Sequence, residues 1–461
     1  MRHTTRNQGR GFRPFPLRVA ALGLLLPLGA CSVDKILEVD DPDVATPGSV
    51  AGREALPAVY AGALADFAHA YAGGGDTGGG SRNEGQILLS GLLGDEFQST
   101  DTFNTRIEID QRDITPASTP GSSANGQLSD AERNLHRARR AAENGTDLFK
   151  ENGLPTDPRR AELFALAGYT YIFFAENYCA GVTFSSIPFT GGDPTFGSPQ
   201  STNEVLATAI ARFDSALAIA PAGSSQARLA TIGKARALLD QGNRAAAAAL
   251  VAAVPTTFSY DVPYSDNTSR QENGVYNYTT DARRYGVSDV EGGEGLPYRS
   301  ANDPRVEYED GGDPFDTNFP DPVFWNQLKY PARDSDVTLA NGIEARLIEA
   351  EALLNGGASA AYLPVLNTLR ATISLPALAD PGTATGRIQQ FFQERAFWLW
   401  LTSHRLGDMR REIRQYGLTE AQVFPSGDYI RGGTYGTDKN LPIFVDEGNN
   451  PNFTGCTSRA A

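Results

Sequence analysis

Three pairs of short, Ala-rich helical segments constrain the fold of this chain more than any other feature of its sequence. The first pair contains small, aromatic and proline residues at the spacing found in the second helix of a tetratricopeptide unit, namely Ala209, Phe213, Ala216 and Pro221. The second pair is 231–241 with 244–254, and the third is 343–354 with 358–371. Because such pairs bury their apolar faces by stacking on their neighbours, the sequence predicts an all-α scaffold of tetratricopeptide-like repeats.

Apolar residues at helical spacing predict four more helices before these repeats. They cover 49–71, 84–93, 129–150 and 158–178. The last of them is apolar on nearly every face, which is typical of a helix surrounded by other helices. We therefore expect it at the centre of the scaffold.

Two segments, 94–128 and 256–335, interrupt the helical pattern of a single domain that covers 49–461. The first mixes acids, hydroxyl groups and aromatic rings without a helical stripe, and we expect it to run as a loop over the surface. The second is rich in aromatic residues among Gly, Asn and Asp. So long a loop inside a helical scaffold indicates a loop-rich face built out from a helical platform.

The stretch 391–411 predicts a helix with a wide apolar face and with charges of both signs. The charged residues considered are Glu394, Arg395, Arg405, Asp408 and Arg411. On a helix that also carries large aromatic rings, these charges are expected to form a buried ion network, with His404 packed beside them. An Arg405→Ala change should therefore impair folding more than ligand binding.

The first thirty residues have the layout of a secretory signal, with five Arg, no acid and an apolar run from Val19 to Leu28. That run is too short to span a membrane. It ends in the sequence L-G-A-C, the lipobox pattern, in which cleavage before Cys31 exposes a thiol that takes a diacylglyceryl group. We expect 1–30 to be a lipoprotein signal peptide and 31–48 a lipidated tether, and the alternative is a plain secretory signal with a chance Cys.

The charge balance narrows the range of partners. The chain has 40 Lys and Arg against 55 Asp and Glu, a net charge of −15. Loss of the signal would remove five Arg and no acid, leaving a net charge of about −20. Such a charge argues against nucleic acid and against anionic membrane surfaces, so we expect attachment to the membrane by lipid alone.

With Cys31 lipidated, only Cys179 and Cys456 remain. In an exported protein, two such thiols are expected to form a disulfide that pins the tail to the body. The alternative is two separately buried thiols.

The sequence contains no constellation that predicts catalysis. Its four His residues are far apart, so a zinc triad or a Ser-His arrangement has no local support. The acidic pairs Asp95 with Glu96 and Glu307 with Glu309 could be drawn as a glycosidase pair, but nothing in their spacing favours that over chance. The run 310–316, D-G-G-D-P-F-D, departs from the calcium-loop pattern. We expect no catalytic residue, cofactor or metal.

Several short sequence motifs occur in the same order as in the SusD/RagB family of nutrient-binding outer-membrane lipoproteins, which this chain resembles. They are the lipobox, the lead-in D-K-I-L-E-V-D-D-P-D, the run E-A-R-L-I-E-A-E-A-L-L in 344–354, E-R to H-R-x-x-D-x-R-R in 394–411, and L-P-I to N-P-N in 441–452. The resemblance implies a lipid-anchored protein facing the cell exterior. It also implies a SusC-type TonB-dependent channel as partner, to which captured oligosaccharide or peptide is handed without chemical change.

Aromatic rings flanked by Asn, Asp and Arg suit a carbohydrate-binding face, because sugar rings stack on aromatic faces while polar groups bond their hydroxyls. The rings chosen as ligand-binding candidates, because they fall in the two loop segments, are Phe97, Phe103, Tyr298 and Trp325. The alternative for each ring is a place in the core of the loop layer. Two other functions stay open: a periplasm-facing tetratricopeptide adaptor that binds proteins, and a lipid-anchored glycan hydrolase.

Overall fold

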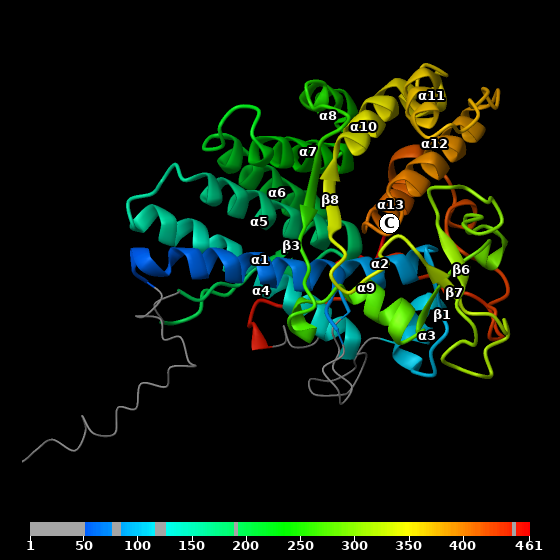
Figure 1. Cartoon of the computed structure of the whole chain (residues 1–461), viewed down its shortest axis with the longest axis horizontal. Coiled ribbons are helices and arrows are strands. Elements are labelled where there is room, and N and C mark those ends of the chain that lie inside the picture. The colour runs from blue at the N-terminus through cyan, green and yellow to red at the C-terminus, as the bar shows by residue number, and fades with distance from the viewer. Residues whose placement is uncertain (1–50, 76–83, 116–125, 189–191, 445–448) are drawn as a thin grey trace, which may run out of the picture. The chain divides into compact units, whose positions relative to one another are not determined.

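The computed structural model describes residues 51–75, 84–115, 126–188, 192–444 and 449–461 (Figure 1). The described residues belong to one compact unit. Cys31, the signal peptide and the tether lie outside the described residues, so their predictions stay predictions. No helix in the described ranges combines the length and the apolar character needed to cross a bilayer.

The scaffold is a stack of helices in which α1 packs on α4, and α4 to α8 pack on one another in chain order, while α2 packs against α1 and α13 (Figure 1). Its members are α1 (Leu56–Ala72), α2 (Gln86–Gly94), α4 (Gly126–Glu151), α5 (Pro158–Asn177), α6 (Thr202–Leu217), α7 (Ser225–Asp240) and α8 (Arg244–Val251). Helix α5 packs against α4, α6 and α7, and nearly all of its residues are buried, so the prediction of a central helix is confirmed. Every predicted helix of this group is present, with ends shifted by a few residues.

An aromatic knob fixes the contact among α5, α6 and α7. Phe213 is fully buried, and a Cβ built on Gly168 of α5 or Gly233 of α7 would come within 2.7 or 2.4 Å of its ring. Only glycine therefore lets these helices approach so closely. Because Ala209 and Ala216 are also fully buried, the tetratricopeptide-like interpretation of this helix is confirmed.

The second group of helices continues the stack and closes the chain. It consists of α10 (Gly342–Leu354), α11 (Leu363–Thr372), α12 (Ala384–Trp398) and α13 (Arg405–Tyr416). Helix α10 packs against α8 on one side and α11 and α12 on the other, so it joins the two groups. The prediction of a mostly helical, repeat-like fold is thus confirmed.

The single helix predicted for 391–411 is wrong, because the stretch folds as two helices separated by a turn at 399–404. Leu401 and Ser403 have φ angles of 54° and 57°, in the left-handed region that ends a helix. Side chains from distant elements form hydrogen bonds with the backbone groups of the turn. Glu96 accepts from the Leu401 N–H at 2.7 Å, and Tyr330 donates to the Leu401 carbonyl at 2.9 Å.

The predicted ion network of these two helices is confirmed as buried and internally paired. Arg395 and Arg411 both bind Asp408, at 2.7 and 2.6 Å. Burial opposes ionisation of Asp408, but these two guanidinium groups outweigh it and lower its pKa to about 2. Glu394 is paired with Arg305 at 2.6 Å, and His404 packs against Arg236 at 2.8 Å.

The strands are short and pair antiparallel in four two-stranded sheets. The pairs are β1 (Phe97–Ser99) with β5 (Tyr285–Val287), β2 (Val182–Thr183) with β3 (Pro199–Gln200), β4 (Ser259–Val262) with β8 (Val337–Asn341), and β6 (Tyr308–Asp310) with β7 (Trp325–Gln327). Three of the four use strands from 256–335, so that segment is a layer of short strands and loops set on the helices.

The prediction that 94–128 runs as a surface loop is wrong for the residues that the structure describes, and 116–125 lie outside them. The segment contains β1 and α3 (Asn104–Asp110), and residues 95–101 are buried. Ion pairs hold it in the interior, because Arg106 of α3 bonds both Glu84 and Asp101. Because these charged groups are buried as pairs, an apolar stripe is not what places the segment in the interior.

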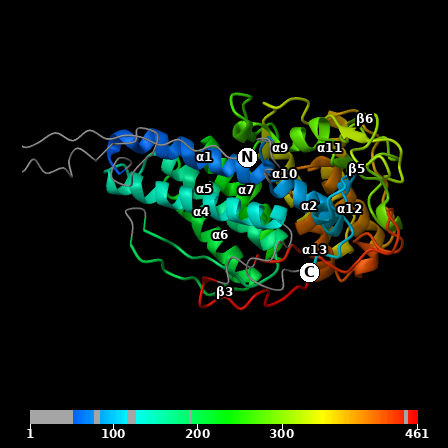
Figure 2. The same cartoon turned by 90° about the horizontal axis from the view of Figure 1, so that it is seen from below.

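The disulfide between Cys179 and Cys456 is confirmed, with 5.7 Å between the Cα atoms. It joins the end of α5 to the C-terminal tail, 277 residues later. In Figure 2 the tail, drawn in red, runs along the segment that contains β3. Asn450 of the tail donates to the Gly197 carbonyl at 2.9 Å, so hydrogen bonds reinforce the covalent link.

Candidate functional site

A pocket of about 440 Å³ opens in the loop layer. Its lining residues are Ser269, Glu272, Asn277, Tyr278, Asp281, Ala282, Arg284, Phe315 and Arg333. All of them come from the aromatic-rich segment 256–335. The pocket has the size of ordinary small-molecule sites and combines aromatic, amide, carboxylate and guanidinium groups.

A π-helical turn, Asn277–Asp281, contributes Asn277, Tyr278 and Asp281 to the pocket lining and continues a short helix, α9 (Gly274–Tyr276). Asn273 caps the helix, since its side chain accepts from the Tyr276 N–H at 3.2 Å. The same side chain donates to the Ser335 carbonyl at 2.8 Å. This links α9 and the turn after it to the segment that carries Arg333, so one residue connects two parts of the chain that contribute to the pocket.

Two exposed phenylalanine rings flank the guanidinium group of Arg284. Its Cζ atom lies 3.9 Å from the centre of the Phe315 ring and 5.0 Å from the centre of the Phe103 ring. The two residues are 42% and 50% exposed, among the most exposed large apolar residues of the described chain. Cation–π contact holds the rings in place while leaving apolar surface available to a ligand.

A buried ion network supports Arg284 from below. Its Nη1 donates to Asp101 at 2.7 Å, and Asp101 also binds Arg106. Arg106 in turn donates through Nε to Glu84 at 2.7 Å. Burial raises the pKa of Glu84 although Arg106 opposes the shift. The network fixes the position of Arg284 because its partners are buried and bonded to one another.

The wall that carries Phe315 is held by backbone and ionic contacts. The Phe315 N–H donates to the Arg283 carbonyl at 3.3 Å, and the Asp316 N–H donates to Thr100 at 2.9 Å. Arg431, from the C-terminal part of the chain, bonds the Asp316 carboxylate at 2.6 Å. Three segments distant in sequence therefore meet at this wall.

Charges at the mouth of the pocket are balanced. Arg333 binds Asp281 at 2.8 Å and lies 3.9 Å from Glu272. Because half of the Arg333 side chain is exposed, this ion pair is a weak one. Its groups can exchange partners with the hydroxyl groups of a ligand at low cost, so the pocket is suited to a neutral, polyhydroxylated molecule with an apolar face.

Two of the four predicted ligand residues are buried and were wrongly assigned. Phe97 is fully buried in β1, with its ring edge-to-face on Tyr285 at 5.8 Å. Tyr298 is fully buried against Trp400 at 6.5 Å and donates to Asp95 at 3.3 Å. Position in a loop segment does not imply exposure, because the loop layer has its own aromatic core.

The other two predicted residues lie at the surface. Phe103 stands at the edge of the pocket, in contact with Arg284. Trp325 is half-buried and is not part of the pocket lining. Its Nε1 donates to Asp321 at 3.0 Å and its ring meets Tyr308 edge-to-face at 5.8 Å.

The sequence patterns did not indicate Arg284, Asp281 and Arg333 as pocket residues. They did not distinguish Tyr278 and Phe315 from the other aromatic residues of 256–335. A signal was present for Phe315, since its neighbours G-G-D-P and D-T-N predict an exposed turn around a large apolar residue. No such signal marks Arg284. Its place beside Phe315 and Phe103 depends on the pairing of β1 with β5.

The acidic pair Asp95 and Glu96 is fully enclosed. Asp95 is bound by Arg405 at 2.7 Å, and burial raises the pKa of Glu96 to about 8. Within the described ranges no group of three or more His, Cys, Asp or Glu side chains has the arrangement of a metal site.

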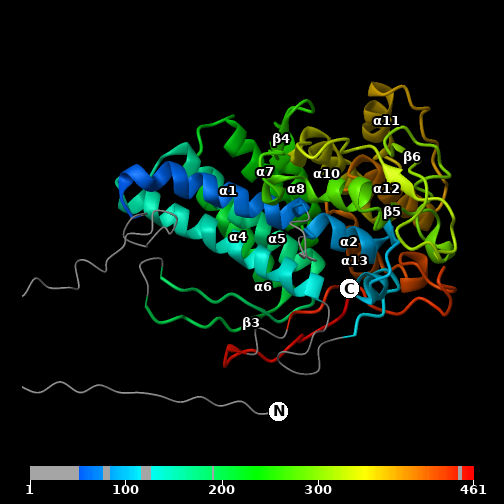
Figure 3. The same cartoon turned by 60° about the horizontal axis from the view of Figure 1, so that its bottom comes forward.

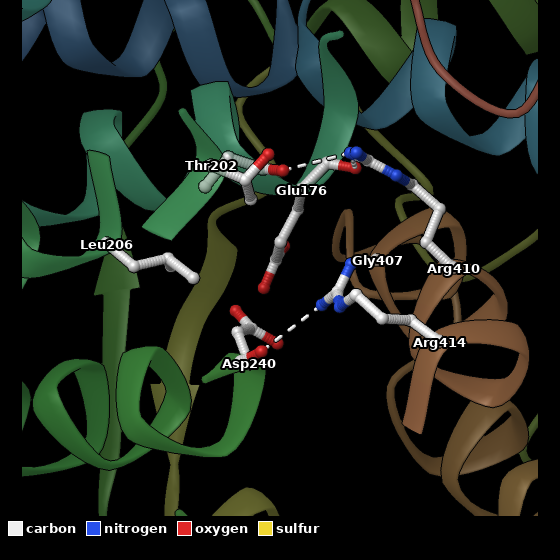
Figure 4. A pocket seen from close by; sticks show the side chains of 8 residues that line it. Glu176, Thr202, Leu206, Asp240, Gly407, Arg410 and Arg414 are labelled. Carbon is white, nitrogen blue, oxygen red and sulfur yellow. Dashed lines mark hydrogen bonds between the residues drawn. The ribbon is translucent and has the colours of Figure 1, made fainter. Parts of the chain in front are cut away.

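A second cavity, shown in Figure 4, lies between α5, α6, α7 and α13. Arg414 donates to the Asp240 carbonyl at 3.1 Å and Arg410 donates to the Glu176 carbonyl at 2.6 Å. The cavity measures about 10 Å³, which is room for a single water. It is a packing void and not a site for an organic ligand.

The described architecture is that of a helical-repeat scaffold with a loop-rich layer on it. No protein-family model and no curated protein matches the chain. Among solved structures, a SusD superfamily protein from Parabacteroides distasonis matches with a TM-score of 0.63, covering 88% of this chain and 99% of that chain at 13% identity. Another, from Bacteroides thetaiotaomicron, has a TM-score of 0.62, coverage of 90% and 100%, and 13% identity.

Surface glycan-binding protein A from Bacteroides uniformis also matches, with a TM-score of 0.58, coverage of 87% and 99%, and 14% identity. These likenesses span nearly the whole of each neighbour. The chain therefore has the SusD-like fold that its sequence phrases predicted.

Proposed function

We propose that this protein captures an oligosaccharide, or a peptide, at the pocket beside Phe315 and passes it on without chemical change. The observation that carries the proposal is the Arg284 guanidinium held between the exposed rings of Phe103 and Phe315, at the edge of a pocket lined with polar groups. Apolar ring faces can stack on the C–H side of a sugar while amides and carboxylates bond its hydroxyls. The SusD-like fold, shared with a protein named as a surface glycan-binding protein, supports this assignment.

The sequence also supports a cellular location and a partner for this protein. The lipobox ending in Cys31 supports attachment to the outer membrane by acyl chains, facing the cell exterior. A SusC-type TonB-dependent channel is the proposed recipient of the ligand, a partner implied by the family resemblance of the sequence. Protease treatment of intact cells distinguishes this arrangement from a periplasm-facing adaptor, which would stay protected.

A binding role, in place of hydrolysis, is supported by the state of the acidic pair. Asp95 is tied to Arg405 and Glu96 to the Leu401 backbone, and both are buried, so neither reaches a substrate. Assay of the purified protein for release of reducing sugar tests this point directly.

The decisive experiment is a glycan and peptide array probed with a soluble form that starts at Ser32. The best ligand is then titrated by calorimetry into the wild type and into Phe315→Ala. Loss of the ring is expected to weaken binding about tenfold, equivalent to about 1.4 kcal/mol. Leu353→Ala is the matched control, because Leu353 on α10 is 43% exposed and Phe315 is 42% exposed.

Failure of every glycan and peptide on the array to bind would contradict the capture role. Equal affinity of the wild type and Phe315→Ala would move the site elsewhere on the molecule.

A further inference from the structure

The turn between α12 and α13 joins the helical scaffold to the loop layer. In Figure 3 these two helices lie at the end of the molecule that carries β5 and β6. From the loop layer, Tyr330 donates to the Leu401 carbonyl at 2.9 Å. From the scaffold, Arg236 of α7 donates to the Ser403 carbonyl at 2.8 Å. One short turn therefore connects two parts of the fold.

The backbone of this turn is strained and depends on the groups around it. Leu401 and Ser403 have φ angles of 54° and 57°, in a region that side chains larger than glycine rarely adopt. Such a conformation persists only where the surrounding structure holds it. A change of charge in a group that holds the turn is therefore expected to loosen it.

Glu344 of α10 is a buried carboxyl beside the turn. It is 1% exposed, and its Oε1 atom lies 3.2 Å from Nε2 of His404, the last residue of the turn. Among the described residues, it is the only carboxyl whose two oxygens are both buried and without a hydrogen-bond partner. An ionised carboxylate in such a place would have no donor to stabilise its charge.

The contacts of His404 determine which of its nitrogens carries a hydrogen. Nδ1 lies 3.0 Å from the Thr402 carbonyl, which can only accept, so Nδ1 is protonated. Nη1 of Arg236 lies 2.8 Å from Nε2 and can only donate, so Nε2 carries no hydrogen. His404 is therefore neutral, in keeping with burial and the charge of Arg236, which lower its pKa well below the usual value.

A neutral His404 implies that Glu344 is protonated. Oε1 of Glu344 faces the lone pair of Nε2, and this contact is favourable only when the oxygen carries a hydrogen. The hydroxyl groups of Tyr71 and Tyr169 do not take its place as donors to Glu344. They donate to the carbonyls of Thr402 and Leu229, at 3.1 and 3.2 Å.

The charged groups that act on Glu344 come from three helices. Burial opposes its ionisation, while Arg236 of α7 and Arg395 of α12 favour it. Asp408 of α13 opposes it. Both guanidinium groups are bonded to other carboxylates, Arg236 to Glu176 at 2.7 Å and Arg395 to Asp408 at 2.7 Å. The balance raises the pKa of Glu344 to about 7.

We propose that Glu344 and His404 form a pH-sensitive pair, which holds the turn between α12 and α13 closed while Glu344 is protonated and loosens it when that proton passes to water. An open turn exposes Glu344 and returns its pKa to the ordinary 4.5, so the closed turn binds the proton more tightly. The stabilisation of the closed turn is therefore complete below pH 4.5 and is lost as the pH rises through 7. This inference is independent of the proposed capture at Phe315.

Hydrogen–deuterium exchange followed by mass spectrometry tests the pair in the full chain in nonionic detergent, at pH 5, 6, 7 and 8. Exchange rates are corrected for the intrinsic effect of pH, and protection is compared for peptides that cover the turn. Peptides from α6 are the internal reference, because none of the charged groups that act on Glu344 belongs to α6.

Glu344→Gln is the test variant, because its amide stays neutral at every pH. Glu349→Gln is the matched control on the same helix, since Glu349 is half-buried and pairs with Arg346 at 3.1 Å, away from the turn. From pH 5 to pH 7, protection of the turn should fall at least about tenfold more in the wild type and in Glu349→Gln than in Glu344→Gln.

Equal pH dependence in the three proteins overturns the proposal, and so does a wild-type turn that responds to pH no more than α6. Glu96, whose pKa is about 8, bonds the same turn and contributes equally to all three proteins. If Glu344→Gln does not fold, Glu96→Gln takes its place, because Glu344 is then the remaining raised carboxyl at the turn. Its turn should still lose at least about tenfold more protection than α6 between pH 5 and pH 7, and no such loss overturns the proposal.

Discussion

Replacing Arg405 by Ala removes a guanidinium group that is 4% exposed and bonded to three carboxylate oxygens. Its Nε and Nη2 donate to Asp95 at 2.7 and 2.9 Å, and its Nη1 donates to Glu412 at 3.2 Å. The change leaves Asp95 buried with only the Leu296 N–H and the Tyr298 hydroxyl as donors. Removing one partner of a buried ion pair typically costs about 3–5 kcal/mol.

Urea unfolding followed by circular dichroism measures the loss of unfolding free energy. Asp95→Asn and the double variant complete a thermodynamic cycle, and the double variant should recover part of the loss because no unpaired charge then stays buried. Arg333→Ala is the exposed control, expected to cost less than about 1 kcal/mol. Arg405 does not line the pocket beside Phe315, so the folded fraction of the variant should bind the proposed ligand with unchanged affinity.

A loss of less than about 1 kcal/mol in Arg405→Ala would refute the reasoning. Normal stability combined with lost ligand affinity would refute it more directly, because Arg405 would then act at the binding site.

Two further variants test other parts of the structure. Cys456→Ser removes the disulfide between α5 and the tail and should lower the free energy of unfolding by about 2–5 kcal/mol. Reduction of the wild type should give the same loss. A wild type whose stability does not change with reductant would contradict this. Glu96→Gln tests the buried carboxyl whose pKa burial raises from 4.5 to about 8. The folded state holds that proton more tightly than the unfolded state does. The stabilisation that protonated Glu96 gives the folded state is therefore complete below pH 4.5 and is lost as the pH rises toward 8. Unfolding by urea at pH 5 and pH 8 should therefore show a fall in wild-type stability that is smaller in Glu96→Gln by on the order of 1 kcal/mol per pH unit, whereas parallel curves would count against the assignment.

The helical scaffold was predictable because its signals are local. Ala209 and Phe213 lie on one stripe of α6, and Ser201 with Glu204 forms a capping box that fixes where this helix begins. Periodicity and caps act within a few residues of chain, so one sequence is enough to reveal them. The pairing of Cys179 with Cys456 was also predictable, since only two thiols remained once Cys31 was assigned to the anchor.

The pocket beside Phe315 and the break between α12 and α13 were decided by tertiary structure. The turn at Leu401 exists because Glu96 and Tyr330, far away in sequence, bond its backbone groups. Phe97 and Phe315 look alike in the sequence, yet one is fully buried and the other is 42% exposed. Burial of a ring in a loop layer depends on which segments cover it, and the choice of those segments is made by contacts that span hundreds of residues. The sequence by itself therefore determines local features such as helix periodicity and caps. Which segments cover a residue is determined only by the tertiary structure.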